Sequence, residues 1–475
     1  MPFRIVFSHG YFIQLDAKEQ PIMRPYPPLG LLYLSAFLQQ HGFANEVFDN
    51  TFYLPHDFKQ YLLKNPPHVL AFNVNLLTKL HILPLVNWIR EQPSLQNTII
   101  VLGGPDVTHN TDAYIQAGAD AVIYGEGEQT MLALVQALSS GYLPTDPKAM
   151  QPISGLVWRN ASTGQITQNL PRPALKNIDD LPQANWQAIN MHQYIETWKK
   201  HHGFSSISVS TQRGCPYTCK WCSTAVFGQS YRRRAPKLVV KELEYLRQNY
   251  NMDLIWFVDD VFTVSHKWLQ AFANELKAQN FSFAFECITR ADRLNTQVLE
   301  LLHQTGCVKV WIGAESGSQS VINAMDRRVN IGHVQKMLIG AKKLGIKTGT
   351  FIMLGYPTET HADIVETVAH LKIANPDFYT ITTVYPIKGT PLYTEVAPQN
   401  SNFMENWAAS SNKELIFKRT YPEKYYYYAI RWVVNEFLFF KLQKTGKTFH
   451  PRAVKAKLKA WAAWVGMFFY KQTTS

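Results

Sequence analysis

Short apolar runs alternate with helical stretches along most of this 475-residue chain. In the first part of the chain the apolar runs are Arg4–Ser8, Glu46–Asp49, Val69–Asn73, Ile99–Leu102 and Ala121–Tyr124. Between the first two runs, Leu29–His41 has helical periodicity and stops at Gly42. Alternating strands and helices predict a parallel sheet with helices on both faces. We therefore expect residues 1–145 to form an α/β domain with a doubly wound, Rossmann-like sheet.

A longer strand–helix repeat begins at Ser206. Its candidate strands are Ile207–Thr211, Leu254–Val258, Phe283–Glu286, Val308–Ile312, Thr348–Met353 and Tyr379–Val384. Helical stretches of ten or more residues separate these runs, and the six strand–helix units over residues 201–400 resemble a partial (β/α)6 barrel. Barrel active sites gather at the carboxyl ends of the strands. The residues that follow each strand are therefore the candidates for chemistry.

Two further segments complete the predicted organisation. Residues 146–200 are expected to form a linker with a small hairpin, made by Ile153–Trp158 and Gln165–Gln168. Residues 401–475 form a basic, aromatic, helical extension with 13 Lys and Arg against 4 Asp and Glu. This extension holds nine of the twelve net positive charges of the chain. A nearly neutral body with one basic appendage argues against a general nucleic-acid binder.

The cysteine usage indicates a reducing compartment. Five cysteines, three of them clustered, do not suggest a disulfide framework. The start of the chain, Met1–Phe7, reads as a strand and not as a secretory signal. No uncharged apolar run reaches the ~18 residues needed to span a bilayer. We expect a cytoplasmic protein.

Cys215, Cys219 and Cys222 form the most specific motif, RGCPYTCKWC over residues 213–222, with the spacing C-x3-C-x2-C. Four cysteines close all irons of a cubane iron–sulfur cluster. Three leave one iron open, as catalytic metal sites require. Unrelated cysteines, or part of a zinc site with a distant ligand, are the alternatives. Zinc motifs usually come as two separated pairs, and the sequence has no second pair.

Polar residues also follow the later strands of the repeat. Asp259 and Asp260 are adjacent carboxylates that are costly to bury unpaired, and they are candidates for binding a ligand or capping the next helix. Arg290 is a candidate for binding a carboxylate, with a salt bridge to Asp292 as the alternative. Glu315 lies in the segment GAESG over residues 313–317, between small residues, where a Glu has few purely structural uses.

The cysteine triplet, GAESG and the segment TFIMLGYP over residues 350–357 resemble the radical SAM superfamily, where SAM is S-adenosylmethionine. The resemblance implies a 4Fe-4S cluster held by Cys215, Cys219 and Cys222, with SAM on the open iron. Residues implied to contact SAM are Glu315, Ser316, Asp259, Arg290 and Gly355. In this superfamily the reduced cluster splits SAM into methionine and a 5′-deoxyadenosyl radical, which abstracts hydrogen from a substrate. No catalytic residue is assigned beyond the cluster.

Residues 1–145 resemble the cobalamin-binding domain that precedes many radical SAM barrels. The resemblance rests on Pro27–Gly30 at the start of the first helix, the GGP…T loop and the GEGE segment. Cobalamin contacts are implied for Gly103, Gly104, Gly125 and Glu126.

One departure from the cobalamin-binding pattern concerns the lower axial histidine. The D-x-H-x-x-G loop is missing after the first strand, where the chain reads HGYFI from His9. His9 is badly placed to substitute, and His109 reads as a polar loop residue. We expect cobalamin to bind without a protein histidine on cobalt. The alternative is a domain that keeps the fold and has lost the cofactor.

The resemblance implies methylation of an unactivated carbon, with an electron donor such as flavodoxin or ferredoxin. A second reading is radical cyclisation or oxidation of a tetrapyrrole- or lipid-like substrate, as in anaerobic magnesium-protoporphyrin ester cyclases. A third is a cluster-bearing regulatory or binding protein. The sequence leaves the substrate open among small molecules, lipids and tetrapyrroles.

The basic extension leaves three readings open. Its aromatic and Lys/Arg residues interleave through Lys455–Trp464. Helices packed on the barrel with a solvated basic rim are the first reading. Peripheral contact with an anionic membrane surface is the second. A lid over the barrel mouth is the third.

Overall fold

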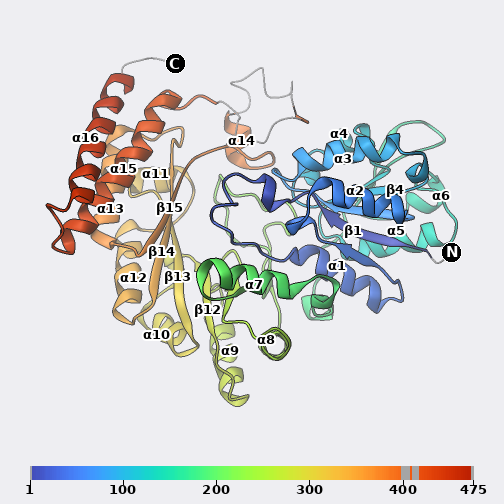
Figure 1. Ribbon diagram of the computed structural model, residues 1–475, viewed down its shortest axis with the longest axis horizontal. Coiled ribbons are helices and arrows are strands. Elements are labelled where there is room, and N and C mark those ends of the chain that lie inside the picture. Colours follow the sequence, from blue (N-terminus) through green and yellow to red (C-terminus); the bar gives the residue numbers. More distant parts are fainter. Residues whose placement is uncertain (1–2, 397–406, 409–416, 472–475) are drawn as a thin grey trace. The chain divides into compact units, whose positions relative to one another are not determined.

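A computed structural model describes residues 3–396, 407–408 and 417–471 (Figure 1). The described residues form two compact units. The first contains residues 3–216, 223–255 and 407–408, and the second contains residues 217–222, 256–396 and 417–471. The predicted domain boundaries at residues 145, 200 and 400 stay predictions.

The first unit is built on a seven-stranded sheet with the order β2-β1-β3-β4-β5-β6-β7. The strands are β1 (Ile5–His9), β2 (Glu46–Phe48), β3 (Val69–Asn73), β4 (Ile99–Gly103), β5 (Ala121–Ile123), β6 (Leu156–Arg159) and β7 (Ile166–Gln168). The first five strands pair in parallel, with Val6 opposite Leu70 in the register of β1 and β3. The predicted strands of this domain are confirmed. The predicted hairpin is also confirmed, and it extends the sheet, because β6 pairs antiparallel with both β5 and β7.

Alternate side chains of these strands enter two separate cores, so the sheet is buried on both faces. The helices of the first unit are α1 (Leu29–Gln40), α2 (Pro55–Lys64), α3 (Lys79–Glu91), α4 (Thr111–Gln116), α5 (Glu128–Ser139), α6 (Pro147–Met150), α7 (Met191–His202) and α8 (Pro236–Tyr250). Val6 and Leu70 pack with α2, α3 and α4, whereas Ile5, Phe7 and Val69 pack with α1, α5 and α6. Burial on both faces explains why the strands are continuous apolar runs without polar alternation.

The six later predicted strands are confirmed as one sheet with the order β15-β14-β13-β12-β11-β8. They are β8 (Ser206–Val209), β11 (Leu254–Phe257), β12 (Ala284–Thr289), β13 (Cys307–Glu315), β14 (Lys347–Leu354) and β15 (Phe378–Thr383). Neighbouring strands from β12 to β15 are parallel. The sequence did not predict the short antiparallel pair of β9 (Gln212–Arg213) and β10 (Arg232–Arg233), which frames the cysteine loop.

Helices follow these strands as the strand–helix repeat predicts. They are α9 (His266–Ala278), α10 (Thr296–Gln304), α11 (Gln319–Ala324), α12 (Ile331–Lys343), α13 (His361–Ala374) and α14 (Pro391–Val396). The chain therefore has an α/β fold, with a Rossmann-like N-terminal sheet and a parallel partial barrel.

Two C-terminal helices, α15 (Glu423–Lys444) and α16 (Pro451–Lys471), pack side by side (Figure 1). Helix α15 also packs on α13, where Lys372 forms an ion pair of 2.8 Å with Glu436 and the Tyr425 hydroxyl lies 2.8 Å from His361 Nδ1. Packing on the barrel, the first of the three readings for this extension, is what the structure shows for α15. Within the described ranges, no helix is both long enough and apolar enough to cross a membrane.

Candidate active site

The cysteine loop runs between β9 and β10, so that a two-stranded ladder holds its ends. The loop centre is fixed by backbone hydrogen bonds, since the Lys220 N–H donates to the Met325 carbonyl (3.0 Å) and the Lys220 carbonyl accepts from Leu392 (2.9 Å). Trp221 packs against the apolar cluster that contains Met325 and Tyr356. Cys215 and Cys219 are buried, and Cys222 is partly exposed. The predicted ligands therefore lie on a loop that is anchored at its ends and its centre.

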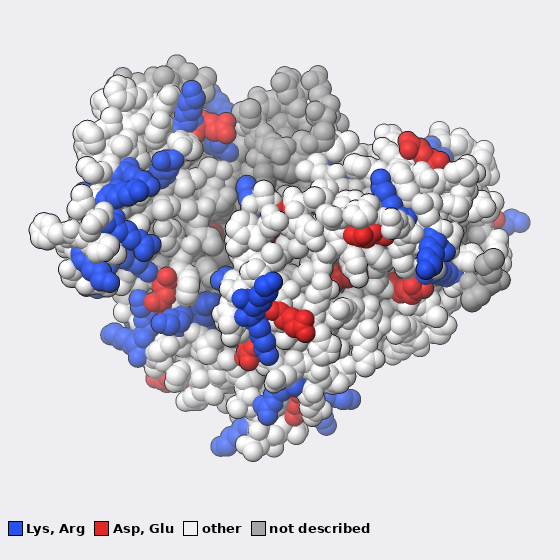
Figure 2. Space-filling view, viewed as in Figure 1, with Lys and Arg blue, Asp and Glu red and all other residues white. Residues whose placement is uncertain are grey.

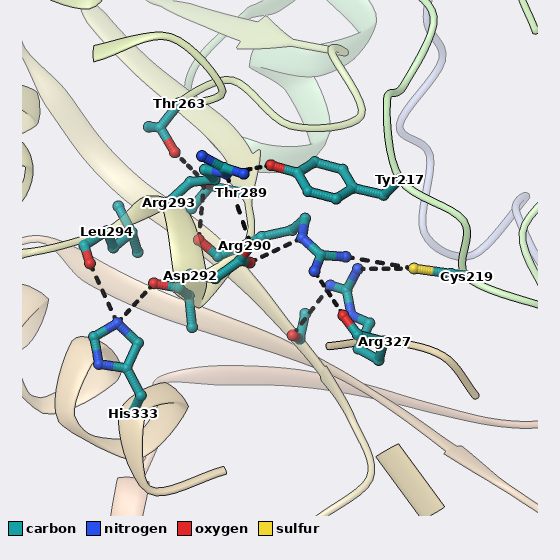
Figure 3. A network of polar contacts seen from close by, with 12 residues as sticks. Tyr217, Cys219, Thr263, Thr289, Arg290, Asp292, Arg293, Leu294, Arg327 and His333 are labelled. Atoms are coloured by element: carbon teal, nitrogen blue, oxygen red, sulfur yellow. Dashed lines mark hydrogen bonds and ion pairs between the residues drawn. The ribbon is translucent and has the colours of Figure 1, made fainter. Parts of the chain in front are cut away.

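Two guanidinium groups converge on Cys219 (Figure 3). Arg290 Nη1 lies 3.4 Å from its Sγ, and Arg327 Nη1 lies 3.6 Å from the same atom. Arg290 also donates to the Arg327 carbonyl at 2.6 Å and stacks 3.8 Å from the centre of the Tyr217 ring. Two N–H donors from arginines thus fix the position of the Cys219 sulfur.

Arg290 forms an ion pair with Asp292 at 2.9 Å, which was the alternative to its predicted role in binding a carboxylate (Figure 3). The Arg290 guanidinium group also donates hydrogen bonds to the Cys219 sulfur and to the Arg327 carbonyl. A SAM contact by Arg290 stays a prediction. Sequence reasoning missed Arg327, because it follows helix α11 and not a strand end.

Glu315 ends β13, where the register with β14 shifts between Gly313 and Glu315. Its backbone has a positive φ of 68°, which is uncommon for a residue with a side chain. The carboxylate is buried and lies 3.4 Å from Arg327 Nη2. Burial raises the pKa of Glu315, and the charges of Arg327 and Arg290 oppose this shift. The structure thus joins Glu315 to the Arg327–Cys219 contact, while a SAM contact by Glu315 stays a prediction.

Ser316 and Gly317 tie the end of β13 to helix α13. The Ser316 hydroxyl accepts from the Ser318 N–H (3.2 Å), and the Gly317 N–H donates to the Thr367 hydroxyl (2.9 Å). A Cβ on Gly317 would lie 2.3 Å from the Thr367 Cα, so only glycine fits. The structure gives Ser316 a scaffold contact, and its SAM contact stays a prediction.

Asp259 and Asp260 follow β11 as predicted. Asp259 is buried and Asp260 is exposed. The same loop is fixed to β12, since the Phe262 N–H donates to the Ile288 carbonyl at 2.8 Å and the hydroxyls of Thr263 and Thr289 bond to each other (Figure 3). Burial makes Asp259 the better candidate of the two for holding a ligand. Its SAM contact stays a prediction.

Gly355 follows β14 with a φ of 87°, and its N–H donates to Glu359 at 2.6 Å. Glu359 is fully buried, and its second carboxyl oxygen has no hydrogen-bond partner among the described residues. Burial raises the pKa of Glu359 to about 8. A mostly protonated Glu359 at neutral pH thus positions the Gly355 loop, which is predicted to contact SAM.

Glu359 is expected to make stability fall as pH rises. Its pKa is 4.5 in an unfolded chain and about 8 in the folded one. The stabilising effect is complete below pH 4.5 and is lost as pH rises through about 8, because folding must then return a proton to the carboxyl group. Glu359→Gln should therefore unfold at higher temperature than wild type at pH 8, by the equivalent of about 1–3 kcal/mol. Near pH 4.5 the two proteins should match more closely. Equal melting shifts at both pH values would contradict this.

The strand ends of the first unit hold the predicted cobalamin loops. Gly103 ends β4, and Gly104 has a φ of 111°. A Cβ on Gly104 would lie 2.6 Å from the Val74 carbonyl oxygen, so strand-end packing alone requires glycine there. Nearby strand ends border a cavity of about 280 Å³, lined among others by His9, Tyr11, Gly30, Asn73 and Thr78.

Both ring nitrogens of His9 are engaged. Its Nε2 lies 2.9 Å from Asp49 and its Nδ1 accepts from the Tyr11 N–H at 3.1 Å. Tyr194 donates to the same Asp49 carboxylate at 2.6 Å. Because neither nitrogen has a lone pair to spare, His9 fits a structural role better than a cobalt ligand.

Glu126 and Glu128 of the GEGE segment form a buried ion cluster with two arginines. Arg213 lies 3.3 Å from Glu126 and also binds Glu128 through both of its terminal nitrogens. Arg232 pairs with the other oxygen of Glu126. Burial alone would raise the pKa of Glu128, but Arg213 holds it below its usual value. Arg213 and Arg232 are paired residues of β9 and β10. The GEGE segment therefore stabilises the two short strands at the ends of the cysteine loop.

Gly125 starts the GEGE segment with a φ of 77°, and its Cβ position is open space. That leaves room for a ligand beside the backbone. Cobalamin contacts by Gly103, Gly104, Gly125 and Glu126 stay predictions, and Glu126 in addition has the two arginine partners described above.

The three predicted cluster ligands, Cys215, Cys219 and Cys222, lie on one loop. In the part of the chain that the structure describes, no three His, Cys, Asp or Glu side chains are grouped as ligands of one ion. The thiolates of a cubane cluster bind different irons and therefore lie farther apart than the ligands of one ion. Cluster binding by the three cysteines stays a prediction, and one of them, Cys219, receives N–H groups from two arginines.

Comparison with known proteins agrees with both halves of this description. Residues 209–371 match the radical SAM superfamily, and residues 23–135 match the B12 binding domain. The chain is 27% identical to an uncharacterised methyltransferase of Pyrococcus horikoshii, over 82% of this chain and 83% of that protein. It is 24% identical to the anaerobic magnesium-protoporphyrin IX monomethyl ester cyclase of Rubrivivax gelatinosus, over 83% and 70%.

Solved structures share the fold. The cobalamin-dependent SAM radical enzyme OxsB, with aqua-cobalamin bound, superposes with a TM-score of 0.73 at 16% identity, over 99% of this chain and 72% of that chain. The radical SAM methyltransferase TsrM of Kitasatospora setae, with cobalamin and a [4Fe-4S] cluster, gives 0.70 at 15% identity, over 93% and 89%. The predicted cofactors, a 4Fe-4S cluster, SAM and cobalamin, are those of the two matched families. This chain is a B12-binding radical SAM enzyme.

Proposed function

We propose that this protein is a cobalamin-dependent methyltransferase that methylates an unactivated carbon of a small-molecule substrate. The observation that carries the proposal is the presence of both domains in one chain, together with similarity to methyltransferases over most of its length. A second methyltransferase, the cytidylyl-2-hydroxyethylphosphonate methyltransferase of Streptomyces wedmorensis, is 25% identical over 70% of this chain. The substrate class stays open among small molecules, lipids and tetrapyrroles, and we infer flavodoxin or ferredoxin as the electron donor.

Under this proposal Cys215, Cys219 and Cys222 hold the cluster. When bound, the cluster and SAM supply a radical that removes hydrogen from carbon, and cobalamin supplies the methyl group. Arg290 and Arg327 position the Cys219 sulfur through their N–H groups. Hydrogen bonds to ligand sulfurs also tune the reduction potential of such clusters.

Other residues would hold SAM at the strand ends. Glu315 and Asp259 have buried carboxyl groups. Each could accept a charge-assisted hydrogen bond from the amino group of SAM. Gly355, fixed by Glu359, offers its backbone to the adenine edge. Ser316 and Arg290 complete the predicted set.

The test is anaerobic reconstitution with methyl-labelled SAM, hydroxocobalamin and candidate substrates. The proposal expects corrinoid to bind, 5′-deoxyadenosine to form and label to enter the product. If no corrinoid binds and no label moves while SAM is still cleaved, methyl transfer is wrong.

A second candidate function is radical cyclisation or oxidation. It is favoured by the similarity to the cyclase of Rubrivivax gelatinosus, which covers as much of this chain as the methyltransferase similarity does. The same experiment separates the two, because a cyclase forms 5′-deoxyadenosine and an altered product without incorporating label.

A further inference from the structure

Helix α16 has one face that nothing in the described part of the chain covers. Its other face packs on α15 through small side chains and one methionine, at Ala453, Ala456, Ala460, Ala463 and Met467. Large apolar side chains point away from that contact, since Leu458 is 63% exposed, Trp461 66%, Phe468 56% and Phe469 69%. Val454 and Phe449, just before the helix, are also exposed. Contiguous apolar patches on a protein surface usually mark an interaction site.

The spacing makes these residues a continuous ridge. Val454, Leu458, Trp461 and Phe468 follow one another at intervals of 4, 3 and 7 residues, which place them on one side of a helix. The buried positions 453, 456, 460, 463 and 467 have the same period on the opposite side. A helix with two apolar faces, one of them buried in the protein, has the second free for a partner.

Basic side chains border the ridge. Helix α16 contains Arg452, Lys455, Lys457, Lys459 and Lys471 and no Asp or Glu. Lys457 is paired with Glu436 at 3.0 Å, whereas no described acidic residue pairs with Lys455 or Lys459. An open groove beside the ridge is lined by Phe449, Leu458, Lys455 and Lys459. In Figure 2 the surface of the lobe that contains α15 and α16 shows blue patches and little red.

The charges around the ridge distinguish between two possible partners, a second copy of this chain and a lipid bilayer. A second copy of this chain would set lysines against lysines around the ridge, because α16 offers no acidic group in return. A bilayer with anionic head groups meets both features, since the ridge enters the head-group region while the lysines stay at its level. Tryptophan, here Trp461, is also one of the side chains enriched at membrane–water interfaces.

We propose that the α16 ridge, formed by Val454, Leu458, Trp461, Phe468 and Phe469, docks this protein on an anionic membrane surface. The helix lies in the plane of the interface and does not cross the bilayer. This inference concerns a surface of the second unit and stands independently of the methyl-transfer proposal.

The test is flotation of the full-length protein with vesicles of phosphatidylcholine alone and of phosphatidylcholine with phosphatidylglycerol. Wild type is expected to float with the anionic vesicles and only weakly with the neutral ones. Lys455→Glu with Lys459→Glu should weaken anionic binding at least about tenfold, because each lysine near the surface contributes about fivefold. Trp461→Ser with Phe468→Ser should weaken it at least about tenfold as well, through lost apolar burial.

Matched controls are Lys237→Glu and Leu170→Ser, which change an exposed lysine and an 81%-exposed leucine outside α16. Both should bind vesicles as wild type does, and all variants should keep wild-type circular dichroism. Equal vesicle binding by wild type and the α16 variants would overturn the proposal. So would a wild-type protein that ignores vesicles but sediments as a dimer that Trp461→Ser converts to monomer, which would identify a second copy as the occupant.

Discussion

Cys219→Ala is expected to abolish the cluster and with it the cleavage of SAM. Cys219 receives N–H groups from Arg290 and Arg327, so its loss removes a ligand and leaves two guanidinium groups without their sulfur. Loss of a residue that merely supports a metal ligand costs about 10–100-fold, so loss of the ligand itself should exceed about 100-fold. Iron analysis and 5′-deoxyadenosine formation, after anaerobic reconstitution, measure the two effects.

Cys287→Ala is the matched control for this result. Cys287 is also buried, but it lies within β12 and not in the cysteine loop. Its alanine variant should take up about four irons per chain, as wild type does. A Cys219→Ala protein that kept full iron content and SAM cleavage would disprove the assignment of this cysteine as a ligand.

Arg213→Leu is expected to destabilise the first unit by about 3–5 kcal/mol. The substitution leaves the carboxylates of Glu126 and Glu128 buried with Arg232 as the remaining described cation of the cluster. An uncompensated buried charge is far more costly than a lost surface pair. Urea unfolding followed by circular dichroism measures the change in the free energy of unfolding.

Arg4→Leu provides the comparison, since Arg4 pairs with Glu46 at 2.9 Å but both side chains are partly exposed. Exposed pairs contribute about 0–1 kcal/mol, so this variant should unfold close to wild type. If Arg213→Leu and Arg4→Leu cost the same, the buried ion cluster does not stabilise the fold in the way described. Because Arg213 directly precedes the cysteine loop, the Arg213→Leu protein should also assemble the cluster less completely.

The strands could be predicted because their signal is local. A strand that is buried on both faces is apolar at nearly every position. The strands Val69–Asn73 and Ile99–Gly103 are therefore recognisable in the sequence as apolar runs. Strands β9 and β10 escaped prediction because each has two residues, which is too short for any periodicity. Their pairing brings Arg213 and Arg232, at the two ends of one loop, to the same carboxylate of Glu126.

Some site residues could also be predicted from local sequence, whereas others could not. The cysteine spacing and the polar residues at strand ends are visible in the chain, because barrel geometry collects those positions at one edge. Arg327 is not at a strand end and lies 108 residues from Cys219, so no local pattern connects them. Glu126 looks like a ligand-binding residue from its GEGE context, but its carboxylate is paired with arginines 87 and 106 positions later.

The sequence by itself determined the two α/β parts, the three-cysteine loop and the family resemblance, because strand burial, helix periodicity and ligand spacing are properties of neighbouring residues. The tertiary structure alone decided which charges meet: Arg327 with Cys219 and Glu315, Arg213 with Glu126 and Glu128, and Glu359 with the backbone of Gly355. It also decided that α15 packs on α13 and that α16 keeps an apolar face exposed. The strength of an ion pair depends on the distance between the two charges and on their burial. Both quantities are set by the tertiary structure and cannot be read from neighbouring residues in the sequence.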